Sequence, residues 1–136
     1  MLEPKEKILL VDDDLDFLEL HKAVLKKHGY EVLTATNSKE GIERIRTDMP
    51  DLIILDLMME KHDAGFYLSK QIKSDPLFKN IPILMISSVA EATGFSFSME
   101  EDGYWMKTDD FLNKPVMPDV LIAKVKQLIA GRKEKN

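Results

Sequence analysis

Four short apolar segments, each running directly into polar residues, constrain the fold of this chain more than any other feature. The segments are residues 8–11, 52–55, 83–86 and 111–112. Unbroken apolar runs this short are typical of strands buried on both faces, as in a parallel sheet covered by helices. Parallel strands end at one edge of their sheet, so the polar residues that follow should meet there. In open α/β sheets, that edge is where ligands bind.

The residues between these segments carry the spacing of helices. Glu31 to Ala35 adds one more expected strand, more exposed than the others and therefore at the sheet edge. The expected helices run from Asp14 to Gly29, from Asn37 or Ser38 to Pro50, from about Phe66 to Asp75, and from about Pro118 to Gly131. In the first, Leu15, Leu18 and Leu25 should form the apolar stripe. Such alternation of strand and helix predicts βαβ units in an α/β fold.

Residues 89–109 are less regular. Symmetry with the other units favours a helix here, the fourth of five, but the sequence supports only a short or distorted one. Gly94 and Gly103 interrupt the segment, and residues 95–99 alternate with a period of two.

Composition limits the class of protein. The chain has 136 residues, no cysteine and a net charge of −5. We expect one domain over residues 1–136, with its core at about 7–131 and no attached output domain. We expect no signal peptide, and no apolar run in the sequence is long enough for a membrane span. The negative charge argues against direct nucleic-acid binding, and the lack of cysteine fits the cytoplasm.

The polar residues at the predicted sheet edge are chemically complementary. Asp56 is the candidate nucleophile, since a carboxylate that attacks phosphorus forms an acyl phosphate. Asp12 and Asp13 could hold Mg²⁺, which takes one or two carboxylates and keeps water and phosphate oxygens as its other ligands. Lys114 could neutralise a phosphoryl oxygen, and the Ser87 hydroxyl could donate to another. The three histidines, His21, His28 and His62, have no metal-binding spacing and are interpreted as surface or packing residues.

These residues occur within four motifs in a specific order. The motifs are Ile8-Leu9-Leu10-Val11-Asp12-Asp13, Leu55-Asp56-Leu57-Met58, Pro82-Ile83-Leu84-Met85-Ile86-Ser87-Ser88 and Phe111-Leu112-Asn113-Lys114-Pro115. From about Lys7 to Gly131 the chain resembles receiver domains of two-component response regulators, of the stand-alone, chemotaxis-regulator-like kind. The resemblance implies a flavodoxin-like, doubly wound sheet of five parallel strands in the order 2-1-3-4-5.

The resemblance also implies a role for each site residue. Asp56 would be the phosphoacceptor, with Mg²⁺ held by Asp12, Asp13, Asp56 and the backbone carbonyl of Met58. Ser87 and Phe111 would be the switch pair that responds to the phosphoryl group, and Lys114 and Ser87 would assist the transfer. Lys114-Pro115 would be a cis peptide. The phosphodonor would be a sensor histidine kinase or a phosphotransfer protein, and the output an unidentified downstream protein.

Several departures from the family pattern bear on the output. Phe111 lacks the phenolic oxygen that many relatives carry, so a switch there must work by packing. The irregular segment 89–109 belongs to the family's output face. We therefore hypothesise that its aromatic residues, Phe95, Phe97, Tyr104 and Trp105, contribute to partner binding, and the alternative is that they fill a local core. The protein would be a monomer or a weak dimer that does not bind membranes.

Two other functions are compatible with part of this residue set. Phosphatases with an aspartyl nucleophile gather similar residues, but they commonly place a second aspartate two positions after the first, where this chain has Met58. A docking module that works without phosphorylation is the other alternative, and the intact acidic set argues against it. We therefore expect a switch that is not an enzyme beyond its own phosphorylation and dephosphorylation. Met58 and Val89 flank the expected phosphoryl site, in the loops after Asp56 and Ser87, and neither offers a base that could align a water. The acyl phosphate on Asp56 should therefore be long-lived.

Overall fold

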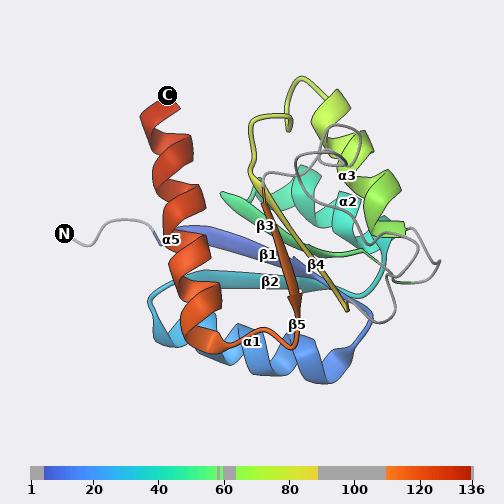
Figure 1. Cartoon of the computed structure of the whole chain (residues 1–136). Helices are drawn as coiled ribbons and strands as arrows, with labels where there is room; N and C mark the ends of the chain where they lie inside the picture. Colours follow the sequence, from blue (N-terminus) through green and yellow to red (C-terminus); the bar gives the residue numbers. More distant parts are fainter. Residues whose placement is uncertain (1–4, 58, 60–63, 89–109, 136) are drawn as a thin grey trace.

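The computed structural model describes residues 5–57, 59, 64–88 and 110–135, and strands and helices alternate along them (Figure 1). The elements are β1 (Lys7–Val11), α1 (Leu15–Lys27), β2 (Glu31–Ala35), α2 (Ser38–Asp48), β3 (Leu52–Asp56), α3 (Ala64–Ser74), β4 (Ile83–Ser88), β5 (Asp110–Lys114) and α5 (Pro118–Lys135). The expected fourth helix falls within residues 89–109, outside the described residues. None of the helices described is long and apolar enough to cross a bilayer.

The five strands form one parallel sheet in the order β2-β1-β3-β4-β5, which confirms the expected topology. β3 is central and every residue in it is buried. β2 is at the edge, as its more polar sequence predicted, and its outward residues are partly exposed. The register pairs Leu55 of β3 with Val11 of β1 and with Met85 of β4, so these three strands end close together.

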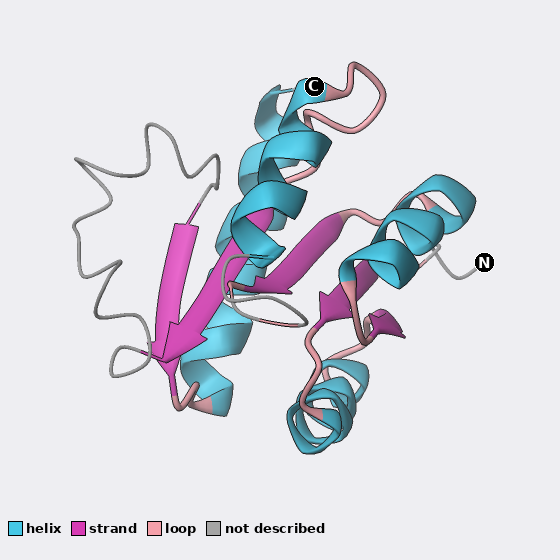
Figure 2. Cartoon of the chain, turned by 90° about the vertical axis from the view of Figure 1, so that its right-hand side faces the viewer, coloured by secondary structure: helices cyan, strands magenta, loops and turns pink. Residues whose placement is uncertain are grey.

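Helices cover both faces of the sheet, giving three layers (Figure 2). On one face α1 and α5 pack over a core that includes Leu10, Ile54 and Leu121. On the other face α2 and α3 pack over a second core that includes Val11, Leu55 and Leu68. Consecutive strand residues contribute to opposite cores, which explains why the strand segments are apolar without interruption.

Local sequence signals fix the helix ends. Asp14 is the N-cap of α1, and its carboxylate accepts from the backbone N–H groups of Asp16 and Phe17 at 3.0 and 3.2 Å. Asn37 caps α2 in the same way, accepting from the Glu40 N–H at 2.9 Å. Gly29 follows α1 with a φ of 92°, a conformation that glycine adopts without steric cost. The predicted boundaries of these two helices are confirmed.

Two details of the helix predictions were wrong. α5 does not end at Gly131 but continues to Lys135. One glycine costs a helix only about 1 kcal/mol, and the residues after it are good helix formers. Leu15 is 64% exposed and is not part of the apolar stripe of α1. The buried positions of that helix are Leu18, His21 and Leu25, so Leu15 lies off the inward face.

Candidate functional site

Strand alternation places three charged residues on the same face of the sheet. Asp12, Asp56 and Lys114 come just after or at the ends of β1, β3 and β5. The residues two positions before them, Leu10, Ile54 and Leu112, all belong to the core under α1 and α5. Because side chains two apart on a strand share a face, the three charged groups start from that face and meet at the strand ends.

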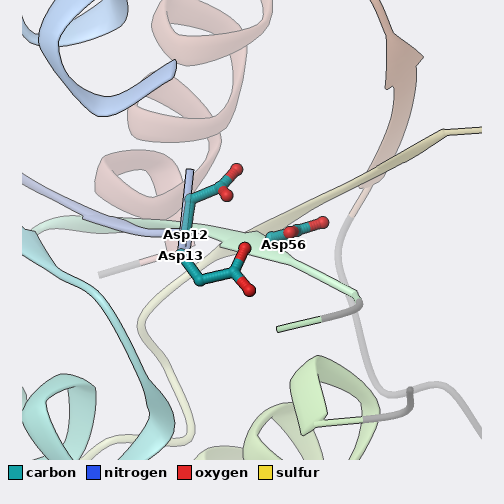
Figure 3. Close-up of side chains that lie close together, drawn as sticks. All are labelled: Asp12, Asp13 and Asp56. Carbon is teal, nitrogen blue, oxygen red and sulfur yellow. The ribbon is translucent and has the colours of Figure 1, made fainter. Parts of the chain in front are cut away.

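Three carboxylates form a cluster at this edge. Asp12, Asp13 and Asp56 each place one carboxylate oxygen within 4.8 Å of the others. Figure 3 shows the three side chains projecting in the same general direction from the ends of β1 and β3. Asp12 and Asp56 are 1% and 6% exposed, whereas Asp13 is open to solvent. The cluster therefore has a buried base and an accessible rim.

The ammonium group of Lys114 neutralises part of this negative charge. Its Nζ lies 3.1 Å from Asp12 Oδ2 and 3.7 Å from Asp56 Oδ2. Burial lowers the pKa of Lys114, but Asp56 and Asp12 raise it by more, so the net pKa lies above its ordinary value and the amine stays charged. The Lys114–Pro115 peptide that follows is cis, as the resemblance implied.

Asp12 is incompletely satisfied by the protein. Its Oδ1 accepts from the Asp14 N–H at 2.9 Å, but its buried Oδ2 has no hydrogen bond of good geometry within the described residues and is held only by the charge of Lys114. Burial raises the pKa of Asp12, and the Asp14 N–H and Lys114 offset this only in part. A buried acceptor beside two other carboxylates suits a small divalent cation, so these residues fit Mg²⁺.

Ser87 lies on β4, the strand next to Asp56, and Phe111 lies on β5, one strand further out; both residues follow the other face of the sheet. Ser87 is 1% exposed and pairs with Asn113 in the register of β4 and β5. Phe111 pairs with Met85 and packs, half-buried, against the core under α2 and α3. Ser87 and Phe111 are therefore diagonal neighbours on adjacent strands, a spacing at which one side chain can respond to the other.

Sequence reasoning did not find the role of Gly65. Its N–H donates to the carbonyl oxygen of Leu57 at 2.8 Å, and a Cβ atom there would lie 2.7 Å from the Leu57 Cα. A side chain at this position would collide with the backbone next to Asp56. The only available signal was a glycine close to the start of a helix, which is weak by itself.

Several residues singled out from the sequence lie outside the described residues. They include Met58, whose carbonyl was expected to bind Mg²⁺, and the aromatic residues Phe95, Phe97, Tyr104 and Trp105. His62, Val89, Gly94 and Gly103 lie outside them as well.

Comparison with known proteins identifies the class. Residues 8–126 match the family described as "Response regulator receiver domain". The chain belongs to this family, whose members are phosphorylation-dependent signalling modules of two-component systems.

Individual relatives agree with that assignment. The chain is 34% identical over 124 residues to the alkaline phosphatase synthesis transcriptional regulatory protein PhoP of Bacillus subtilis, covering 91% of this chain and 48% of PhoP. It is 30% identical over 128 residues to protein PilH of Pseudomonas aeruginosa, covering 92% of this chain and 98% of PilH. The chain thus spans about half the length of several curated relatives and nearly the whole of PilH.

Solved structures show the same fold. The chemotaxis response regulator CheY4 of Vibrio cholerae superimposes with a TM-score of 0.79 at 27% identity, covering 92% of this chain and 99% of that one. A CheY-like receiver domain protein from Methanospirillum hungatei shares the fold with a TM-score of 0.82 at 24% identity, covering 98% of this chain and all of that one.

Proposed function

We propose that the chain is a switch that is turned on when Asp56 accepts a phosphoryl group. The observation that carries this proposal is the position of the Lys114 ammonium, 3.1 Å from Asp12 and 3.7 Å from Asp56, beside a cluster of three carboxylates. Phosphoryl transfer needs an aligned nucleophile and neutralised charge more than it needs acid–base chemistry. The cluster supplies both.

The proposed step is a substitution at phosphorus. A carboxylate oxygen of Asp56 forms a bond to the phosphorus atom, and the bond from phosphorus to the donor breaks. The donor atom leaves with the electron pair, and Asp56 becomes an acyl phosphate. Lys114 holds its charge throughout, because Asp56 and Asp12 raise its pKa, and it can pair with a phosphoryl oxygen. The hydroxyl of Ser87 donates to another phosphoryl oxygen.

We assign Asp12, Asp13 and Asp56 as the side chains that hold Mg²⁺, with the carbonyl of Met58 completing the protein ligands. The buried Asp12 Oδ2, which lacks a well-formed hydrogen bond, supports this assignment. When bound, Mg²⁺ supplies positive charge that lets carboxylates and phosphoryl oxygens share one site. The chain's own contribution is to hold the three carboxylates within reach of one another.

The switch proposal concerns Ser87 and Phe111. Phe111 is half-buried against the core under α2 and α3. Drawing the Ser87 hydroxyl toward the phosphoryl group would change the space next to its ring, and the ring would then take a second packing position. Phe111 has no hydroxyl, so the two positions differ by packing alone. The phosphoryl group then favours one of two existing conformations and so alters a protein-binding face.

The remaining proposals concern partners and location. Receiver domains are phosphorylated by histidine kinases or phosphotransfer proteins, and we propose such a donor for Asp56. The output would be another protein, contacted in part by Phe95, Phe97, Tyr104 and Trp105. We also propose a cytoplasmic location, where kinases that use ATP act.

The test uses a small phosphodonor. The protein is incubated with Mg²⁺ and acetyl phosphate, and its intact mass is measured. One added phosphate is expected, and Asp56→Asn should abolish it. Asp75→Asn, which changes a carboxylate after α3, is the control and should leave the labelling unchanged. No added mass, or equal labelling of the Asp56→Asn protein, would refute the proposal.

A phosphatase with an aspartyl nucleophile is the alternative from another class. It requires a general acid near the nucleophile, and Met58 occupies the usual position. Release of phosphate from p-nitrophenyl phosphate with turnover would favour this alternative.

A further inference from the structure

Two aromatic rings on α1 stack against each other beside Lys114. The rings of Phe17 and His21 have centroids 4.0 Å apart and planes inclined by 28°. The Nζ of Lys114 lies 4.7 Å from the centroid of the Phe17 ring, within the range of a cation–π contact. Figure 1 shows α1 beside the segment that joins β5 to α5. Lys114 is the last residue of β5, directly before this segment. The stack therefore contacts the proposed catalytic lysine from outside the acidic cluster.

His21 links this stack to the backbone on both sides. It is 3% exposed, and its Nδ1 lies 2.9 Å from the Phe17 carbonyl oxygen. A carbonyl oxygen can only accept, so Nδ1 donates in this contact. On the other side, Nε2 lies 3.5 Å from the carbonyl oxygen of Val116, two residues after Lys114. With Nδ1 donating, a neutral imidazole has no N–H at Nε2, so the approach to Val116 is a packing contact and His21 supports Lys114 through the Phe17 ring.

Lys114 needs such support because its surroundings offer competing positions. A lysine is a point charge on a flexible four-carbon stem. The hollow next to it is lined by Asp14 and Asp16, two exposed carboxylates, as well as by Phe17. An ammonium that turned toward these acids would leave Asp56. The Phe17 ring offers a weaker but fixed attraction at the position from which Lys114 still reaches Asp12 and Asp56.

We propose that the Phe17–His21 stack is a platform that positions the ammonium of Lys114 over Asp12 and Asp56 for contact with the incoming phosphoryl group. Phe17 and His21 are positioning residues: Phe17 holds the lysine directly, and His21 holds the Phe17 ring. This inference rests on the proposed phosphorylation of Asp56 for its purpose, but the position of the lysine can be tested without phosphorylation.

The first test observes the lysine itself. In protein labelled with ¹³C-lysine, the ε-CH₂ signal of Lys114, assigned with Lys114→Arg, should be displaced by the ring current of Phe17. Phe17→Leu should return the signal to the position of an ordinary lysine, and Phe17→Tyr should keep it displaced. Leu20→Val, which alters the same hollow on the same helix, is the control and should have no effect.

The second test measures the rate of phosphorylation by acetyl phosphate with Mg²⁺. Phe17→Leu should slow labelling by about threefold to fivefold, the factor that corresponds to a cation–π contact at a partly exposed site. Phe17→Tyr should restore the rate, because it restores the ring. His21→Leu should also slow labelling, since the Phe17 ring loses its stacking partner. If Phe17→Leu fails to fold, Phe17→Met replaces it.

The outcomes separate the platform from a purely structural stack. If Phe17→Leu lowers the thermal midpoint but leaves the Lys114 signal displaced, or slows labelling no more than Leu20→Val does, the platform is refuted. If the wild-type protein accepts no phosphate at all, the proposed function fails. In that case the ε-CH₂ signal of Lys114 alone tests whether the Phe17–His21 stack positions the lysine.

Discussion

Gly65, the second residue of α3, lies directly against the peptide of Asp56. Its N–H donates to the carbonyl oxygen of Leu57 at 2.8 Å, and a Cβ atom at position 65 would lie 2.8 Å from the carbonyl carbon of Asp56. Contacts so short do not occur for real Cβ atoms. The close approach of α3 to the proposed phosphoacceptor therefore depends on the absence of a side chain at this position.

Gly65→Ala should destabilise the protein and disturb the site. Since the Cβ would meet backbone, which cannot turn aside as a flexible side chain can, α3 or the end of β3 must shift. We expect a loss of about 1–3 kcal/mol in the free energy of unfolding, typical of overpacking, measured by urea denaturation. Labelling of Asp56 by acetyl phosphate should slow as well, because the carboxylate moves relative to Lys114.

Gly131→Ala is the matched control for this change. Gly131 lies inside α5, and a Cβ there would meet nothing within 4 Å. Alanine is a better helix former than glycine, so this variant should be more stable by about 0.5–1 kcal/mol. A loss of stability in Gly131→Ala would contradict the open space around Gly131, and no loss in Gly65→Ala would contradict the close backbone contact at Gly65.

Much of the fold and of the site could be predicted because the signals were local. The buried strands are short apolar runs that are followed by a polar or charged residue recognisable in the sequence, as Leu55 is followed by the carboxylate of Asp56. Parallel pairing then brings Asp12, Asp56 and Lys114 together without further information. The caps of α1 and α2 were equally local, since Asp14 and Asn37 bond to backbone N–H groups two or three residues away.

What sequence reasoning missed depends on contacts between distant residues of ordinary type. His21 was interpreted as a surface or packing residue, and it is buried; its i,i+4 spacing permits the stack with Phe17, but the position of that stack beside Lys114 could not be predicted from the sequence. The approach of Gly65 to Asp56 requires the path of the chain between them. Nothing in the sequence near Gly131 marks the contact of Arg132 with Asp51, which accompanies the longer α5.

Arg132→Ala should destabilise the domain at the end opposite the acidic cluster. The guanidinium donates to the backbone oxygen of Asp51 at 3.1 Å and to its Oδ1 at 3.2 Å, and the Lys7 N–H donates to Asp51 Oδ2 at 2.8 Å. Removing the donor leaves partly buried acceptors unpaired, so we expect a loss of about 1–2 kcal/mol in the free energy of unfolding. Urea denaturation measures this loss, without any change in the labelling of Asp56.

Arg44→Ala serves as the comparison for Arg132→Ala. Arg44 pairs with Asp48 at 3.7 Å, and its side chain is 52% exposed. Exposed helix pairs contribute only about 0.3–0.5 kcal/mol. Equal losses in the two variants would show that the contact of Arg132 with Asp51 has no special weight.

The stability of the metal-free protein should fall with rising pH because of Asp12. Burial raises the pKa of this carboxyl in the folded state above its ordinary value of 3.8. The unfolded chain therefore loses its proton first, and stability declines as pH rises past the ordinary pKa toward the folded one. Asp12→Asn removes this contribution. In EDTA, the thermal midpoint of the wild type relative to Asp12→Asn should drop as the pH rises above 3.8, and a constant difference would argue against the shift.

Mg²⁺ should reverse this loss at neutral pH. A ligand that binds only the folded state stabilises it, by about 1.4 kcal/mol when its free concentration is roughly ten times the Kd. The thermal midpoint of the wild type should therefore rise with MgCl₂, whereas Asp12→Asn should respond much less. Potassium chloride at matched ionic strength is the control for simple screening. An equal response to both salts would indicate that the acidic cluster does not bind the ion.

The acyl phosphate on Asp56 should be long-lived. Its hydrolysis requires a water aligned for attack on phosphorus, and such alignment usually depends on a side chain that can accept or donate a hydrogen bond. The resemblance puts Met58 and Val89 beside the phosphoryl group, and neither can do this. After removal of acetyl phosphate, intact mass measured over time in Mg²⁺ should show a decay slower than seconds. Met58→Asn offers an amide that can hold the water, so its phosphate should decay faster, and Met59→Asn is the neighbouring control. Decay of the wild-type phosphate within seconds would mean that another group of the site activates the water.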